Sequence, residues 1–176
     1  MQPTSAAAND ADRLYAILAG EKVHPAVLDA AMRDFDESAK NAVVSRVAAM
    51  FEPPPSGALL DRLLLILTPR NKATMAVAFT ANLRSPLPEA RRASLSGLEK
   101  LGDSEITSFA ILSLRDDVDR VVATACQILA ERATADPDLR KLLEEVYRAR
   151  AGKKEFYLSN SILEAKGIGR HAAPEK

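Results

Sequence analysis

The residues that could do chemistry in this chain are few, and the two histidines come first among them. His24 lies directly before Pro25, in a position typical of a turn, and His171 lies close to the C-terminus. Neither histidine has a neighbour at a metal-ligand spacing such as His-Glu-x-x-His. A histidine acts as a catalytic base only when other groups hold it in place, so we interpret His24 as a turn residue.

The single cysteine, Cys126, lies in the middle of a helix expected over residues 117–132. A reactive cysteine is typically found at a helix N-terminus or beside cationic groups, whereas a buried cysteine behaves as a small hydrophobic residue. We therefore predict that Cys126 is buried and unreactive. One cysteine cannot form an internal disulfide, and this cysteine usage is typical of an intracellular protein.

Two short segments look like ligand-binding motifs but lack the required context. The carboxylates Asp116, Asp117 and Asp119 do not have the spacing of an EF-hand loop, and they lie at the start of a predicted helix whose dipole they would offset. Residues 166–170 read Lys-Gly-Ile-Gly-Arg, but no predicted strand precedes them, as a dinucleotide-binding loop requires. We therefore expect no metal, no cofactor and no catalytic residue, and we predict that the protein is not an enzyme.

The charge balance and the hydropathy pattern argue against further classes. Lys and Arg number 24, and Asp and Glu also number 24, whereas binding to nucleic acid or to a membrane surface depends on excess basic charge. The longest apolar run, residues 63–67, is far shorter than the ~20 residues of a membrane span. Residues 1–10 lack the basic and apolar regions of a signal peptide. We therefore expect a cytoplasmic protein without membrane contact.

The spacing of apolar residues predicts an all-α protein. Leu139, Leu142, Leu143 and Val146, for example, share one helix face. Aromatic residues make up only 5% of the chain, so the core must be built largely from Leu, Ala, Val and Ile, and the abundance of Leu and Ala favours helices. Prolines fall between the apolar segments, where helices begin or end. The predicted helices cover residues 10–19, 25–35, 38–51, 57–67, 71–83, 87–101, 104–114, 117–132 and 136–150.

The helical segments repeat with a period of about 31 residues. A shift of 31 places Leu98 on Leu129, and a shift of 32 is needed across the turn that contains three prolines, residues 53–55. A single pair of helices cannot bury both of its apolar faces, whereas stacked pairs can. The period therefore predicts an α-solenoid of about four to five antiparallel helix pairs over residues 9–151.

Two copies of this repeat share a motif. A leucine ends the first helix, a turn containing acidic residues or proline follows, and small and apolar residues recur along the second helix. The copies read Leu114, Asp116-Asp117, Val121, Ala125, Leu129, and Leu83, Pro86, Ala90-Arg91, Ser94, Leu98, Leu101-Gly102-Asp103. This motif resembles the HEAT-like repeats of the armadillo-type family, particularly the short repeats of bacterial proteins, most clearly over residues 71–132 and more faintly over 25–67. Val122 departs from the pattern, because the family has an arginine there that pairs with an aspartate between repeats.

The resemblance implies that the second helix of each pair lines a concave surface that binds another protein. The polar positions off the apolar stripes of these helices are the candidate binding residues. They are Arg92, Ser96, Glu99, Lys100, Thr124, Gln127 and Glu131. Because their charges are mixed, they suit a protein surface better than a phosphate backbone. We therefore expect a non-catalytic interaction module or scaffold, although a fold of this kind does not by itself specify a function.

Two alternatives remain open. The first is nucleic-acid binding through Arg91, Arg92, Arg115, Arg120 and the C-terminal tail. The second is an accessory subunit or lyase-like protein that acts on a protein-bound cofactor such as a tetrapyrrole, because bilin lyases and some other HEAT-like proteins are enzymes. The chain lacks the paired His-Glu motifs of relatives resembling deoxyhypusine hydroxylase, and it lacks the tryptophan of those resembling alkylpurine DNA glycosylases.

The C-terminal segment, residues 152–166, is too apolar to be a linker. We predict that Ser159 or Asn160 caps a short helix that packs back onto the last repeat, and that residues 1–8 and 167–176 are disordered. The other interpretation is that this segment docks onto a partner or a second copy of the chain. Its candidate docking residues are Phe156, Tyr157, Leu158, Ile162 and Leu163.

Overall fold

A computed structural model of the chain describes residues 5–50, 52–150 and 156–169. Every regular element within these ranges is a helix, which confirms the all-α prediction. None of the helices in the described ranges is both long and apolar enough to cross a membrane. The chain divides into two compact units, Met1–Leu101 and Gly102–Lys176.

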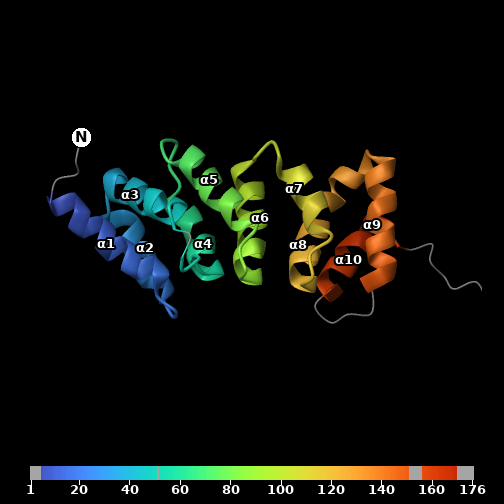
Figure 1. Ribbon diagram of the computed structural model, residues 1–176, viewed down its shortest axis with the longest axis horizontal. Helices are drawn as coiled ribbons and strands as arrows, with labels where there is room; N and C mark the ends of the chain where they lie inside the picture. Colours follow the sequence, from blue (N-terminus) through green and yellow to red (C-terminus); the bar gives the residue numbers. More distant parts are fainter. Residues whose placement is uncertain (1–4, 51, 151–155, 170–176) are drawn as a thin grey trace, which may run out of the picture. The chain divides into compact units, whose positions relative to one another are not determined.

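The first unit contains six α-helices and one short 3-10 helix, drawn from blue to green in Figure 1. They are α1 (Ser5–Ala19), α2 (Pro25–Asp34), α3 (Glu37–Ala48), α4 (Gly57–Leu63), η1 (Leu64–Ile66), α5 (Lys72–Asn82) and α6 (Pro88–Leu101). Helix α3 packs against α1 on one side and α5 on the other, while α6 packs against both α4 and α5. Helices α1, α3 and α5 therefore follow one another in one row, and α4 and α6 are neighbours in a second.

Two glycines let α6 approach its neighbours closely. A Cβ atom on Gly97 would lie 2.5 Å from Cζ of Phe79, which belongs to α5 and is completely buried. A Cβ atom on Gly57, at the start of α4, would lie 2.6 Å from the backbone oxygen of Glu89. Any side chain at either position would meet atoms already in place, so these glycines set the distance between the packed helices.

The second unit contains four α-helices and one 3-10 helix. They are α7 (Ile106–Ser113), α8 (Asp119–Ala130), η2 (Arg132–Thr134), α9 (Pro137–Arg150) and α10 (Tyr157–Ala165). Helix α8 contacts α7, α9 and α10, and it is buried along most of its length. The core of this unit therefore forms around α8, in which Leu129 is fully buried.

The sequence located the helices well in the middle of the chain and less well at its ends. Helix α1 begins at Ser5, earlier than the predicted residue 10 and inside the stretch expected to be disordered. The prediction that Ser159 or Asn160 caps the last helix was wrong, because α10 begins at Tyr157 and its N-cap residue is Phe156. Phe156 is fully buried, so the helix start is fixed by apolar packing rather than by a polar cap.

The starts of the even-numbered helices follow a regular interval. Helices α2, α4, α6 and α8 begin at Pro25, Gly57, Pro88 and Asp119, hence 32, 31 and 31 residues apart. The longer first interval contains the proline-rich turn in which the sequence indicated one extra residue. The interval seen in the apolar residues thus also separates the starts of these four helices.

Candidate functional site

The histidine that the sequence assigned to a turn caps a helix. His24 is the N-cap residue of α2, and its Nδ1 atom accepts a hydrogen bond from the backbone N–H of Ala26 at 3.2 Å. A structural role for His24 is therefore confirmed, since the ring satisfies one of the backbone donors left free at the helix start. His171 lies outside the described residues.

Cys126 is fully buried in α8, as predicted. Burial raises the pKa of its thiol to about 12, and the positive charge of Arg150 offsets only part of this effect. The thiol therefore stays protonated near neutral pH. Because the thiolate is the nucleophilic form, Cys126 cannot serve as a nucleophile in this conformation.

The carboxylates around residue 117 stabilise the start of α8. Asp116 Oδ1 accepts a hydrogen bond from the backbone N–H of Val118 at 2.9 Å, and Asp119 in the first helical turn pairs with the guanidinium of Arg150. Asp119 and Arg150 are both mostly buried. Within the described ranges, no group of three or more His, Cys, Asp or Glu residues could hold a metal ion.

The Gly-x-Gly segment closes a helix. Gly167 has a φ of 72°. Its N–H donates to the carbonyl oxygen of Glu164 at 2.9 Å, and the N–H of Ile168 donates to the carbonyl oxygen of Leu163 at 2.8 Å. These two bonds form a Schellman motif, in which glycine supplies the left-handed residue. Three residues that the sequence assigned to the disordered tail, 167–169, therefore end α10, and Ile168 among them is buried. The rest of that tail lies outside the described residues.

The candidate binding residues of the first unit lie along α6. Glu99 and Lys100 are exposed, whereas Arg92 and Ser96 are half-buried. Arg92 Nη2 donates to Asp61 Oδ2 of α4 at 2.7 Å, so part of its charge is neutralised within the unit. Glu99 and Lys100 are thus the charged residues of this set that are most accessible from solvent.

The candidate binding residues of the second unit lie on α8 and directly after it. Thr124 Oγ1 donates to the backbone oxygen of Arg120 at 3.0 Å, which is a local helix contact. Gln127 is exposed, and Glu131 forms an ion pair of 2.6 Å with Lys166, the C-cap residue of α10. Glu131 therefore helps to hold the C-terminal helix.

The arginines considered for nucleic-acid binding differ in their availability. Arg91 Nη1 donates to the backbone oxygen of Ser85 at 2.9 Å, and Arg92 is paired with Asp61. Arg115 and Arg120 are exposed, and they belong to the other unit. Two of the four guanidinium groups thus have partners within the first unit.

The candidate docking residues of the C-terminal segment are partly buried. Phe156 and Leu163 are fully buried, whereas Ile162 is 38% exposed. The side chains of Tyr157 and Leu158 lie outside the described part of the structure. Helix α10 packs against α8, as expected for a segment that folds back. Two of the three side chains that the structure describes are therefore buried within the second unit.

Polar contacts also attach α10 to α9. Tyr147 Oη donates to Glu164 Oε1 at 2.5 Å, and Arg140 Nη2 donates to the backbone oxygen of Gly167 at 2.7 Å. The hydrogen bond to Glu164 raises the pKa of Tyr147, because the carboxylate favours the protonated phenol. No pattern in the sequence indicated these contacts, which depend on how α9 and α10 pack.

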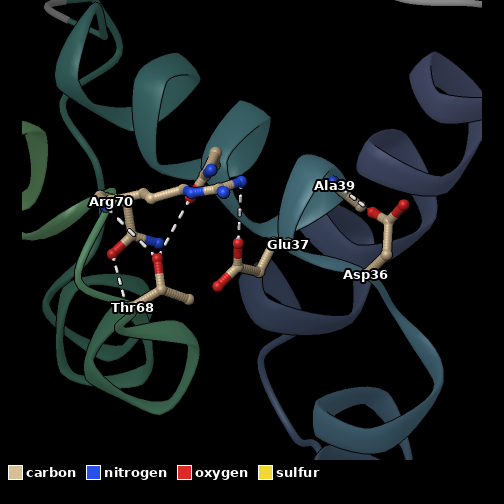
Figure 2. Close-up of polar contacts among 7 residues, drawn as sticks. Asp36, Glu37, Ala39, Thr68 and Arg70 are labelled. Carbon is tan, nitrogen blue, oxygen red and sulfur yellow. Dashed lines mark hydrogen bonds and ion pairs between the residues drawn. The ribbon is translucent and has the colours of Figure 1, made fainter.

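A polar network between α3 and the start of α5 was also not expected from the sequence (Figure 2). The side chain of Asn71 is buried; its Oδ1 accepts from the N–H of Thr68 at 2.8 Å, and its Nδ2 donates to the carbonyl oxygen of Ile66 at 2.9 Å. Figure 2 shows Arg70 extending to Glu37 at the start of α3, an ion pair of 3.3 Å. The Thr-Pro-Arg-Asn order of residues 68–71 is a turn signal that could have indicated part of this network.

Comparisons of the chain with protein-family models, with curated proteins and with solved structures gave no match.

Proposed function

We propose that this chain is a non-catalytic HEAT-like repeat protein that binds another protein through the exposed side of its second helices. The observation that carries the proposal is the ion pair between Asp61 and Arg92. Asp61 is the fifth residue of α4 and Arg92 is the fifth residue of α6, so the pair joins equivalent positions one period apart. A contact between equivalent positions is typical of stacked repeats.

The packing within the first unit supports an α-solenoid. Helices α1, α3 and α5 form one row, and α4 and α6 are neighbours in the other, with α5 and α6 packed as a pair. In such an arrangement each pair buries both of its apolar faces against its neighbours. The regular starts of α2, α4, α6 and α8 extend the period into the second unit.

The exposed side of α6 supports a protein partner. Glu99 and Lys100 are adjacent, exposed and opposite in charge, and Ser96 lies one turn earlier. A surface of this kind can pair with both signs of charge on a protein, whereas binding to a phosphate backbone is favoured by clustered positive charge.

The proposal can be tested by site-specific photo-crosslinking in the native cell. A photoreactive residue at Lys100 should capture a defined protein, whereas the same residue at Thr80, an exposed position on α5, should not. Charge reversal then tests the captured partner in purified form. Lys100→Glu should reduce its affinity by about tenfold or more, and Lys72→Glu, at the exposed start of α5, should leave it unchanged.

Equal crosslinking from Lys100 and Thr80, or an affinity that Lys100→Glu and Lys72→Glu change equally, would contradict the assignment of the surface. Capture of nucleic acid rather than protein would favour the first alternative, and its affinity would then fall steeply with added salt.

A further inference from the structure

One side of α7 exposes apolar side chains and carries no charge along the helix. Residues 106–113 include no Asp, Glu, Lys, Arg or His. Helix α7 packs against α8, and its buried residues Ile106 and Ala110 share one side of the helix. On the opposite side Ile111 is 38% exposed and Leu112 is 67% exposed, the highest value among the large apolar side chains that the structure describes. Burial of these two side chains in an interface would remove apolar surface from water.

Opposite charges lie at the two ends of this side. Glu105 directly precedes α7, Arg115 follows its C-cap residue, and both are exposed. Residues 105, 108, 112 and 115 are spaced by three, four and three positions, so they lie along the same side of the helix. We call this exposed set the α7 face; its members are Glu105, Ser108, Ile111, Leu112 and Arg115. The carboxylates that come after it, residues 116–119, belong to the turn and the start of α8.

We propose that the α7 face binds the α7 face of a second copy of this chain, with the two helices antiparallel and related by a two-fold axis at the level of Ala110. In this register Glu105 of one copy lies opposite Arg115 of the other, and Ser108 lies opposite Leu112, because both pairs of positions are centred on 110. Each contact occurs twice, since in a two-fold interface residue i meets j and j meets i. The positive end of each helix dipole also lies beside the negative end of the other.

The charges and shapes of the α7 face complement each other in this antiparallel register. A parallel pairing would bring like charges together at both ends, whereas the antiparallel pairing brings opposite charges together at both. Ser108 is small, so it leaves room for Leu112 of the other copy. The chain as a whole has a formal net charge of zero, which does not oppose association of two copies.

The α7 face is small, so the dimer should be weak. Ten residues separate Glu105 from Arg115, which is about 15 Å along a helix. Stable interfaces are larger than a single helix pair of this length, whereas transient ones include interfaces of this size. The second copy should therefore bind reversibly, in a way that depends on protein concentration.

Sedimentation equilibrium of the full chain tests this proposal. The wild-type chain should form a dimer with a dissociation constant below about 1 mM. Leu112→Ala should raise this constant about tenfold, because both copies lose the central apolar contact. Since Leu112 is exposed, the variant should keep the circular dichroism of the wild type at 222 nm.

Charge reversal tests the antiparallel register. Glu105→Arg and Arg115→Glu each place like charges at both ends of the interface, so each variant alone should have a dissociation constant about tenfold higher. In a mixed dimer of the two variants, opposite charges face each other again at both ends. An equal mixture should therefore associate about as tightly as the wild type, and a fluorophore on one variant reports the mixed dimer.

Glu145→Arg is the matched control. Glu145 is exposed on α9, and its reversal changes the net charge as much as Glu105→Arg does, so it should leave the dissociation constant unchanged. A chain that stays monomeric up to about 1 mM would overturn the proposal, and the α7 face would then be assigned to a different protein. Equal weakening by Glu105→Arg and Glu145→Arg, or a mixture of charge variants that associates no more tightly than either alone, would overturn it as well.

Discussion

The close approach of α5 and α6 at Gly97 leads to a quantitative prediction. A Cβ atom at this position would lie 2.5, 2.6 and 2.7 Å from three ring atoms of Phe79, whereas carbon atoms in contact prefer separations of roughly 3.5–4.0 Å. Phe79 is completely buried and cannot move into solvent. Overpacking of this kind costs about 1–3 kcal/mol, and the higher helix propensity of alanine returns about 1 kcal/mol. We therefore expect Gly97→Ala to destabilise the protein by up to about 2 kcal/mol.

The sign of this effect should reverse when the ring is removed. Leucine lacks the Cε and Cζ atoms that the new Cβ would meet, so Phe79→Leu creates the missing space at its own cost of about 1–2 kcal/mol. In that background Gly97→Ala should stabilise the protein by about 1 kcal/mol through helix propensity alone. The two substitutions should thus be coupled by about 1–3 kcal/mol in a double-mutant cycle, which is the overpacking cost that the smaller side chain removes.

Urea unfolding followed by circular dichroism at 222 nm measures each corner of the cycle. Lys100→Ala, at an exposed position on the same helix, is the control and should have nearly the same small effect in both backgrounds. If Gly97→Ala has the same effect on the free energy of unfolding in the wild type as in the Phe79→Leu background, then the glycine does not set the distance between α5 and α6.

Four further predictions concern buried groups. Leu98→Asp and Leu129→Asp should each unfold the unit that contains them, because each places an unpaired carboxylate at a fully buried position; a wild-type unfolding curve for either variant would contradict this. Since burial raises the pKa of Cys126 from 9.0 to about 12, its thiol should react with Ellman's reagent at pH 8 only after unfolding. Because the folded state favours the protonated thiol, the free energy of unfolding should fall as the pH rises from about 9 towards 12. In Cys126→Ala, which has no thiol, urea unfolding curves should show a smaller fall over the same range. Arg150→Met should cost about 1–3 kcal/mol, because Asp119 keeps its mostly buried position without its ion pair; a change in the urea midpoint no larger than experimental error would refute this.

The parts of the fold that could be predicted from sequence depend on local chemistry. The starts of α2 and α6 at Pro25 and Pro88 follow from the fixed φ of proline and from the apolar spacing that comes after it. The burial of Cys126 followed from its place on an apolar helix face. The start of α10 could not be found in this way, because its N-cap residue Phe156 makes no side-chain cap hydrogen bond and is instead fully buried.

The candidate binding residues could likewise be predicted only as far as local periodicity determines their exposure. Helix periodicity placed Glu99 and Lys100 off the apolar stripe of α6, and both are exposed. Periodicity could not show that Arg92 is paired with Asp61 or that Glu131 is paired with Lys166, since these partners come from other helices. A shift of 31 residues applied to charges as well as to apolar residues would have revealed the first pair.

The central position of α8 has a consequence for how the two units unfold. In a linear repeat array each repeat depends only on its neighbours, so the ends can unfold while the rest stays folded. In the second unit α7, α9 and α10 all pack against α8, so loss of α8 removes the support of every other helix at once. This unit should therefore lose its structure in a single all-or-none step, whereas the row of α1, α3 and α5 can fray from its N-terminal end. Deletion or duplication of one helix pair would accordingly be better tolerated before residue 101 than after it.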